Sequence, residues 1–380
     1  MKLFHISDLH IGKRVNGFSM IDDQKFVFGE IERIVERERP EGILLSGDIY
    51  DNHNPSEEAV RLFSDILTGL SSLTKVFIIS GNHDSDEKLA FASGILKKAN
   101  VYISPVFKGE VDVVELDDEY GKVRIHLLPF LKPQDVRHYH EEREIKSYDD
   151  AIRAVLENHE IDLSERNVLL SHQFVTGAST SDSEEMSVGG VENIGADVYR
   201  DYDYVALGHL HRPQNLNVSN KMRYAGSPLK YSFSEEFDTK SITVVELREK
   251  GNVVVDTIPI PSLHGMHTIE GSYNDVMQKK FYEGTTYQND YLRVVLTDEN
   301  ELMDALSRLR SVYPFIMMVE WKRRGNGGNE YREEELSAIK KRKPLDIIRD
   351  FYGMQVGTDM NENQEKYLVD TLESIDGGDR

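Results

Sequence analysis

Residues 76–84 read VFIISGNHD, an apolar run followed by a glycine and then by amide, imidazole and carboxylate side chains. The run is typical of a buried β-strand, and Gly81 allows a sharp turn at its end. Two earlier runs end in the same way, namely Lys2–Ser7 before Asp8 and His10, and Gly42–Ser46 before Gly47 and Asp48. A helical repeat over residues 21–38 separates the first two runs. The first half of the chain therefore predicts βαβ units.

A second helix is expected after the second strand. Asn54 resembles an N-cap, with Pro55 in the first turn and Glu57 three residues after the cap. Further β runs cover residues 112–116, 123–130, 167–171, 204–207, 241–247 and 252–260. Because helical stretches do not separate the later runs, the second half of the sheet is expected to be antiparallel or mixed.

The domain boundaries expected from these patterns are 1–262 for an α/β core, 263–324 for a small α+β domain, 325–335 for a flexible linker and 336–380 for a helical segment. Pro259-Ile260-Pro261 marks the edge of the core, and strands at 291–296 and 315–321 flank a helix at 299–312. The linker is rich in glycine and asparagine. The short terminal helices cannot bury an apolar face alone, so they predict a binding partner.

The composition excludes several classes of protein. The chain of 380 residues has no cysteine, which excludes disulfides and thiolate metal sites. No apolar stretch approaches the ~18 residues of a membrane span, and the first apolar run is too short for a secretory signal, so a soluble cytoplasmic protein is expected. A net charge of −22 repels phosphate backbones unless a metal, a partner or a local patch offsets it. Residues 263–324, with 8 basic and 9 acidic side chains, repel them least.

Candidate metal ligands follow five of the predicted strands, and they are Asp8, His10, Asp48, Asn82, His172, His209 and His211. In an open α/β sheet the ligand crevice lies beyond the carboxyl ends of the strands, so these side chains are expected to converge. Seven oxygen and imidazole ligands exceed what one structural zinc takes, but they suit two ions that share a bridging carboxylate. Four imidazoles favour Mn²⁺, Fe²⁺ or Zn²⁺ over Mg²⁺. Such a centre would bind a phosphate ester and activate water for in-line displacement.

Each motif alone has an ordinary structural explanation, such as a capped turn after a strand. Their occurrence in one order, each after a β run, favours the metal centre. The remaining histidines are expected to be structural or exposed, and they are His5, His53, His126, His138, His140, His159, His264 and His267.

The order D-x-H, G-D, G-N-H-D, a lone His and G-H-x-H resembles that of the calcineurin-like metallophosphoesterases. Residues 205–214 (VALGHLHRPQ) and 224–233 (YAGSPLKYSF) are similar to the SbcD family, the nuclease subunits of bacterial SbcCD complexes. The similarity is strongest over 1–262. It implies a four-layer sandwich of mixed sheets flanked by helices, with a capping domain over 263–324 and partner-binding helices at the C-terminus.

The resemblance also implies roles for the site residues. One manganese ion would be held by Asp8, His10, Asp48 and His211, and the other by Asp48 (bridging), Asn82, His172 and His209. His83 would not be a ligand but would stabilise the transition state or protonate the leaving oxygen, and Asp84 could orient its imidazole. Some archaeal relatives carry a histidine where this chain has Asp51; His53 is nearby but not equivalent.

The resemblance implies partners and activities as well. The terminal helices would dock on the coiled-coil base of an SbcC-type ATPase, in a complex within which this chain forms a homodimer. The activities implied are an ATP-dependent 3′–5′ exonuclease on double-stranded DNA and an endonuclease on single strands and hairpins, in DNA repair, recombination and replication. The chain has no G-x-x-x-x-G-K-[ST] motif, so any ATP requirement comes from a partner.

Two alternatives use the same motifs. A phosphatase or cyclic-nucleotide phosphodiesterase could share the metal centre, but it would not need residues 263–380. A non-catalytic scaffold could retain the metals for stability, but it would have no use for a non-ligand His83. Cleavage of small phosphate esters without cleavage of DNA would favour the first alternative.

Overall fold

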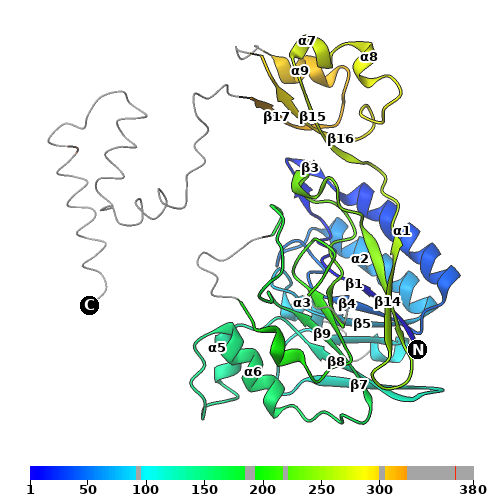
Figure 1. Cartoon of the computed structure of the whole chain (residues 1–380), viewed down its shortest axis with the longest axis vertical. Coiled ribbons are helices and arrows are strands. Elements are labelled where there is room, and N and C mark those ends of the chain that lie inside the picture. The colour runs from blue at the N-terminus through cyan, green and yellow to red at the C-terminus, as the bar shows by residue number, and fades with distance from the viewer. Residues whose placement is uncertain (91–95, 185–192, 217–220, 299–303, 323–363, 365–380) are drawn as a thin grey trace. The chain divides into compact units, whose positions relative to one another are not determined.

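The computed structural model describes residues 1–90, 96–184, 193–216, 221–298, 304–322 and 364 (Figure 1). The predicted linker at 325–335 and the helical segment at 336–380 lie outside the described residues, apart from Gln364. Residues Met1–Lys322 form one compact unit. Among the described residues, no helix is long and apolar enough to cross a bilayer.

The first sheet has six strands in the order β14-β13-β1-β4-β5-β6. Its strands are β1 (Lys2–Ile6), β4 (Gly42–Ser46), β5 (Lys75–Ile79), β6 (Val101–Ser104), β13 (Ser241–Leu247) and β14 (Val253–Pro259). The strands β1, β4, β5 and β6 are parallel to one another, and β13 and β14 add antiparallel at the β1 edge. Helix α1 (Ile21–Glu38) connects β1 to β4, and α2 (Glu57–Leu73) connects β4 to β5. The predicted βαβ units are confirmed.

The start of α2 differs from the prediction. The N-cap is Ser56, whose Oγ accepts a hydrogen bond from the Ala59 backbone N–H at 3.2 Å. Asn54 instead lies in a turn in which its backbone N–H donates to the Asn52 side chain. The predicted Asn54 cap is therefore wrong by two residues, because Pro55 stands before the cap rather than inside the first helical turn.

The second sheet has the order β11-β12-β10-β9-β8-β7. Its strands are β7 (Asp112–Asp118), β8 (Gly121–Leu128), β9 (Arg166–His172), β10 (Tyr204–Gly208), β11 (Gln214–Asn215) and β12 (Met222–Tyr224). It is mixed: β8, β9, β10 and β12 are parallel, and β7 and β11 pair antiparallel at the edges. The later β runs thus divide between two sheets, since β13 and β14 return to the first.

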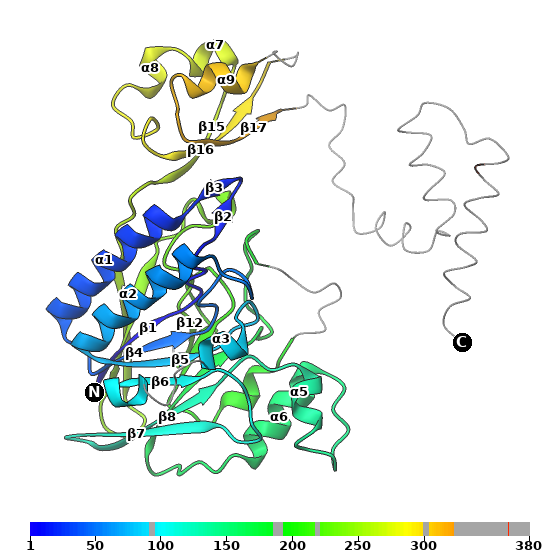
Figure 2. The ribbon, with the colours of Figure 1, turned by 180° about the vertical axis from the view of Figure 1, so that it is seen from behind.

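The two sheets pack face to face. Apolar side chains of both form one buried layer, with Leu44 and Phe77 from the first sheet and Ile125, Val168 and Leu170 from the second. Helices α1 and α2 cover the outer face of the first sheet, and α5 (Pro133–Arg137) and α6 (Tyr148–Asn158) lie on the other side, against the second (Figures 1 and 2). The architecture is the four-layer sandwich that the sequence motifs implied.

Residues 266–321 form a smaller three-stranded sheet, β15 (Met266–Gly271), β16 (Tyr291–Leu296) and β17 (Ile316–Trp321). Helices α7 (Tyr273–Val276) and α8 (Lys279–Tyr282) precede β16, and α9 (Ala305–Arg310) precedes β17. All three strands are parallel, because a helical crossover returns the chain to the same end of the sheet before each new strand. The sequence predicted β16 and β17 but missed β15.

The remaining elements are short: β2 (Arg14–Val15), β3 (Phe18–Ser19), α3 (Asp86–Ala90) and the 3₁₀ turns Lys97–Ala99, Ala196–Tyr199 and Phe233–Glu235.

Asp23 on α1 connects the smaller sheet to the core. Its side chain is buried, with 1% of the residue surface exposed. It accepts a hydrogen bond from the Tyr291 hydroxyl at 2.6 Å and lies 2.9 Å from His264 Nδ1.

Candidate metal centre

The predicted ligands follow the carboxyl ends of strands in both sheets. Asp8 and His10 follow β1, Asp48 follows β4, and Asn82 follows β5. In the second sheet His172 is the last residue of β9, and His209 and His211 follow β10. A continuous series of contacts, described below, joins all seven predicted ligands and His83. The two sheets therefore bring together residues that lie up to about two hundred positions apart.

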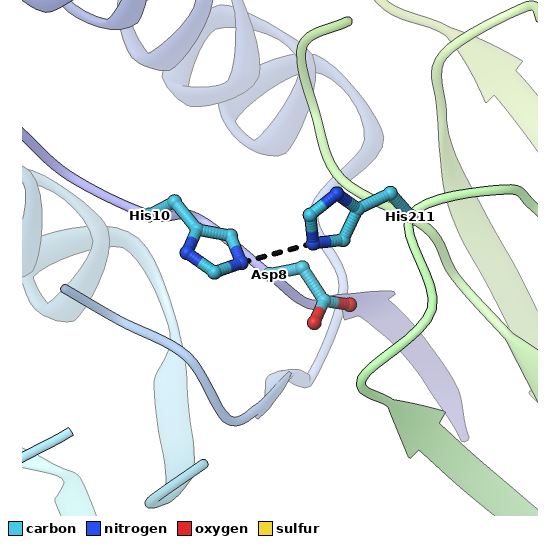
Figure 3. A group of neighbouring side chains, drawn as sticks. All are labelled: Asp8, His10 and His211. Atoms are coloured by element: carbon cyan, nitrogen blue, oxygen red, sulfur yellow. Dashed lines mark hydrogen bonds between the residues drawn. The ribbon is translucent and has the colours of Figure 1, made fainter. Parts of the chain in front are cut away.

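The first group consists of Asp8, His10 and His211, whose side chains point toward one another in Figure 3. Their nearest ligand atoms all lie within 4.8 Å of one another. The two imidazoles face each other with 3.0 Å between their Nε2 atoms. Asp8 Oδ1 also accepts a hydrogen bond from the His209 backbone N–H at 2.9 Å, which ties the β1 end to the β10 end.

Asp48 lies between this group and the second one. Its Oδ2 is 3.5 Å from His10 Nε2 and 3.3 Å from His172 Nε2. Asn82 completes the second group, because its Oδ1 lies 3.1 Å from His172 Nε2 and 3.0 Å from His209 Nδ1. One carboxylate oxygen thus faces both groups, which is the position a bridging ligand needs.

The hydrogen bonds of the histidines fix which nitrogen can bind a cation. His172 Nδ1 lies 2.7 Å from the Ser46 carbonyl oxygen, which can only accept, so Nδ1 carries a proton and Nε2 is the nitrogen that faces the cluster. The same holds for His211, whose Nδ1 lies 2.5 Å from Ser183 Oγ while that hydroxyl donates to Glu235. Two imidazoles, of His172 and His211, therefore keep a proton on Nδ1 and turn Nε2 toward the cluster. The donor set fits divalent cations.

Burial shapes the charges of the cluster. It raises the pKa of the Asp8 carboxyl to about 7 and lowers the pKa of His209 to about 3. Burial also opposes the charges of Asp48 and His172, yet their mutual attraction lowers the pKa of Asp48 and raises that of His172 to about 9. A bound cation would relieve the buried negative charge, and it would displace the proton from His172 Nε2 and take the imidazoles as ligands.

The backbone helps to aim the ligands. Asp8, His10 and Asp48 have φ angles of 54°, 43° and 50°, in the left-handed region that residues other than glycine rarely adopt. Glycine is required next to them at Gly81, where a Cβ would overlap the Asp48 carboxylate. The turn after β5 can therefore approach the bridging position only as glycine.

His83 lies next to both groups: one of its ring nitrogens is within 4.8 Å of ligand atoms of His10 and Asp48. Its backbone N–H donates to Asp48 Oδ1 at 3.0 Å, and its Nδ1 lies 3.0 Å from the Asp51 carbonyl oxygen. Because that carbonyl can only accept, Nδ1 carries a proton, and this hydrogen bond leaves Nε2 unengaged by Asp51. The imidazole is oriented by Asp51, and the predicted orientation by Asp84 is wrong.

Asp84 supports the loops instead. Its buried carboxylate accepts hydrogen bonds from the backbone N–H groups of Ile49, Tyr50 and Gly81 at 2.9–3.1 Å. It therefore joins the loop after β4 to the loop after β5. His53 is not part of the cluster: its Nδ1 lies 2.7 Å from the Asp84 carbonyl oxygen, and its side chain is exposed.

Sequence reasoning missed the side chains that hold the ligands. Gln24 on α1 donates to the His10 carbonyl oxygen at 2.8 Å and accepts from the Gly12 N–H at 3.0 Å. The Tyr231 hydroxyl donates to the Leu9 carbonyl oxygen at 2.6 Å. Tyr231 lies in the 224–233 stretch that is similar to the SbcD family, but no sequence pattern around Gln24 or Tyr231 indicates these contacts.

A buried ion pair holds His211. Lys240 Nζ lies 2.5 Å from Glu235 Oε2, and it also donates to the His211 carbonyl oxygen at 2.8 Å and to Ser227 Oγ at 3.0 Å. The other oxygen of Glu235 accepts from the Ser183 hydroxyl that contacts His211 Nδ1. Glu235 is fully buried. The pair therefore holds His211 at two points: Lys240 binds its backbone carbonyl, and Glu235 holds its imidazole through Ser183.

We expect Lys240→Met to destabilise the metal-free protein by ~3–5 kcal/mol, because it leaves the buried Glu235 carboxylate without its cation. Urea unfolding followed by circular dichroism measures this change. The double variant Lys240→Met with Glu235→Gln removes both charges and should recover part of the loss. A loss below ~1 kcal/mol in the single variant would contradict this account of the pair.

The fold and the centre together define a metallophosphoesterase, and sequence comparisons agree. The family model for calcineurin-like phosphoesterases matches residues 1–213, and a model described as the type 5 capsule protein repressor C-terminal domain matches residues 262–355. The SbcD component of the nuclease SbcCD from Staphylococcus epidermidis is 31% identical over 380 residues, which cover 99% of either chain. The chain therefore belongs to the SbcD family of calcineurin-like phosphoesterases, and it is a metal-dependent phosphodiesterase.

Solved structures with similar folds are more distant. A dimetal phosphatase from Danio rerio is 13% identical with a TM-score of 0.40, covering 69% of this chain and 98% of that chain. GAP50 from the inner membrane complex of Plasmodium is 12% identical with a TM-score of 0.41, covering 68% of this chain and 84% of that chain.

Proposed function

We propose that this chain is the two-metal DNA nuclease component of an SbcCD-type complex that acts in DNA repair, recombination and replication in the cytoplasm. The observation that carries the proposal is the position of Asp48, with one carboxylate oxygen 3.5 Å from His10 and 3.3 Å from His172. Membership of the SbcD family supports DNA as the substrate and an SbcC-type ATPase as the partner.

In this proposal the two groups of ligands each hold one ion, most favourably Mn²⁺. Asp8, His10, Asp48 and His211 hold the first, and Asp48, Asn82, His172 and His209 hold the second. Ions bound there would supply charge neutralisation at the phosphate, activation of water and stabilisation of charge during in-line displacement. Imidazole-rich ligand sets favour Mn²⁺, Fe²⁺ or Zn²⁺ over Mg²⁺.

The protein's own residues position these groups and move the proton. The Asp51 carbonyl holds the His83 ring, so its Nε2 is directed to protonate the leaving oxygen or to stabilise the charge that develops on the phosphate. Glu235 and Ser183 hold His211 in the tautomer that binds a cation. Gln24 and Asp84 keep the loops that carry His10 and Asp48 in place.

The remaining parts of the chain have proposed roles in substrate and partner binding. Residues 263–324 cap the DNA, which fits their near-neutral charge in an otherwise acidic chain. Residues 336–380 bind the coiled-coil base of the SbcC-type ATPase, in a complex with two copies of this chain. ATP bound by that partner drives 3′–5′ exonuclease action on double strands, while single strands and hairpins are cleaved endonucleolytically.

The direct test is incubation of the purified chain with Mn²⁺ and a hairpin or single-stranded oligonucleotide, with and without the SbcC-type ATPase and ATP. We expect metal-dependent nicking by the chain alone and processive degradation of double strands only with partner and ATP. Cleavage of small phosphate esters or cyclic nucleotides without any cleavage of DNA would contradict the proposal.

Deletion of residues 325–380 should separate the two roles. We expect the shortened chain to retain manganese-dependent nicking of single strands, because every proposed ligand lies in the compact unit Met1–Lys322. It should no longer co-purify with the SbcC-type ATPase. Undiminished co-purification would remove the partner-binding role from the terminal segment, and a thermal melt of the shortened chain controls for its folding.

A further inference from the structure

An open recess of about 370 Å³ adjoins the candidate metal centre. Its lining includes Asn82 of the second ligand group, together with His53, Ser85, Phe130, Lys132 and Gln134. None of these apart from Asn82 belongs to the ligand set or to the residues that support it. The recess therefore begins at the metals and extends away from them, over the loop that follows β8.

Phe130 forms the wall of the recess next to the centre. Its ring lies nearly parallel to that of His209, with 6.5 Å between the ring centroids and an angle of 19°, and it meets the His172 ring edge-on at 6.2 Å. The side chain is only partly buried, and it lines the recess. An aromatic ring that is fixed against two ligands and partly exposed to a cavity is a platform on which a base can stack.

The loop that carries this platform is held in place from both ends. The Phe130 backbone N–H donates to the Ser80 carbonyl oxygen at 3.0 Å, just before Gly81 and Asn82. The next carbonyl, of Leu131, accepts from the buried Gln173 side chain at 3.1 Å. The Lys132 N–H then donates to Asp135 Oδ2 at 2.9 Å as α5 begins. The wall is thus preorganised, which lowers the entropy lost when a ligand binds.

The charges in the recess restrict what it can hold. Lys132 is exposed at its rim, and among the described residues its ammonium group pairs with no carboxylate. Glu87 and Asp135 also line the recess, so it does not favour a ligand with several phosphates. Asn82 and Gln134 supply amide groups. A ring face, an ammonium group at the rim and amide donors and acceptors suit a single nucleotide.

We propose that the recess holds the nucleotide next to the scissile phosphate, with its base stacked on Phe130 and its neighbouring phosphate beside Lys132. The inference rests on the proposed DNA nuclease function and adds to it a binding subsite for one base. This subsite favours a strand whose base is unpaired at the cut, since a paired base must first leave its stack to reach the ring. Single strands, hairpin loops and frayed ends meet this requirement.

The test compares two substrates of the full chain with Mn²⁺: a single-stranded oligonucleotide and methyl p-nitrophenyl phosphate, a small diester. The variants are Phe130→Leu, Phe130→Tyr and Lys132→Gln, with Lys122→Gln at the opposite end of β8 as the charge-matched control. We expect Phe130→Leu and Lys132→Gln to lower the ratio of kcat/KM for DNA to kcat/KM for the diester about tenfold. Phe130→Tyr, which keeps the ring, and Lys122→Gln should leave the ratio near that of the unmodified chain.

A second readout does not depend on cleavage rates. 5-Iododeoxyuridine placed next to the cut should crosslink to Phe130 on irradiation, as mass spectrometry of the peptides can show, and the crosslink should vanish in Phe130→Leu. A ratio that stays constant, or a crosslink to a peptide outside the recess, overturns the proposal while the nuclease function stands. Equal losses on both substrates also overturn it, because Phe130 would then only support His172 and His209. If the unmodified chain cleaves the diester but not DNA, the proposed function and the recess both fail.

Discussion

His83→Ala is expected to reduce cleavage of single-stranded DNA by ~10²–10⁴-fold while the protein still takes up two metal ions. The His83 ring lies next to His10 and Asp48, but it is not one of the proposed ligands. Its Nδ1 is engaged by the Asp51 carbonyl oxygen, so Nε2 is the nitrogen suited to proton transfer. Its backbone N–H, which binds Asp48, is unchanged in the variant. The chemistry should therefore be lost without loss of the centre.

Metal content measured after dialysis against Mn²⁺, set beside single-turnover cleavage rates, checks this expectation. His138→Ala is the matched control, because His138 is exposed and contacts only Tyr139 among the described aromatic rings. The control should cleave DNA at the unmodified rate. Loss of both metals together with activity in His83→Ala would show that His83 is a ligand.

Asp48→Asn should be still more damaging, with cleavage reduced at least ~10³-fold and both ions held weakly. Its Oδ2 faces His10 and His172 at once, so removal of its charge affects both groups of ligands. Asparagine keeps the shape of the side chain, but an amide cannot neutralise two shared cations, and a metal centre contributes several kcal/mol of transition-state stabilisation. Calorimetric titration with Mn²⁺ would measure the loss of binding.

A control for burial is available in the same sandwich. Asp203 is also buried, and it accepts hydrogen bonds from the Asn167 N–H and Lys250 Nζ far from the ligands. Asp203→Asn should lower stability but leave manganese uptake intact. If Asp48→Asn retained both ions at unmodified affinity, the bridging assignment would be wrong.

The sequence was sufficient to predict that the ligand side chains lie close together, because this depends on the topology of a parallel sheet. Asp8, Asp48 and Asn82 each come directly after an apolar run, and parallel strands end at one edge of a sheet. The division into two sheets could not be predicted in the same way. Residues 241–247 read as one more β run, and only packing decides that they pair with β1 rather than with β12.

The supporting contacts were also beyond sequence reasoning. Ser183 and Glu235 are 52 positions apart, and each is an ordinary polar residue in a loop or short turn. Their roles arise because two loops meet at His211. Asp84 shows the opposite error, since its position next to His83 in the sequence suggested a partnership, whereas its carboxylate is turned toward the backbone of Ile49 and Tyr50.

The left-handed backbone at Asp8, His10 and Asp48 has a consequence for laboratory evolution. Glycine adopts such angles without steric cost, whereas each of these residues is held there at some expense to the folded state. A screen for thermal stability alone would therefore select glycine at three positions that supply proposed metal ligands. Mutant libraries that are screened for thermal stability should therefore keep these three residues unchanged. Otherwise the most stable variants are expected to lack activity.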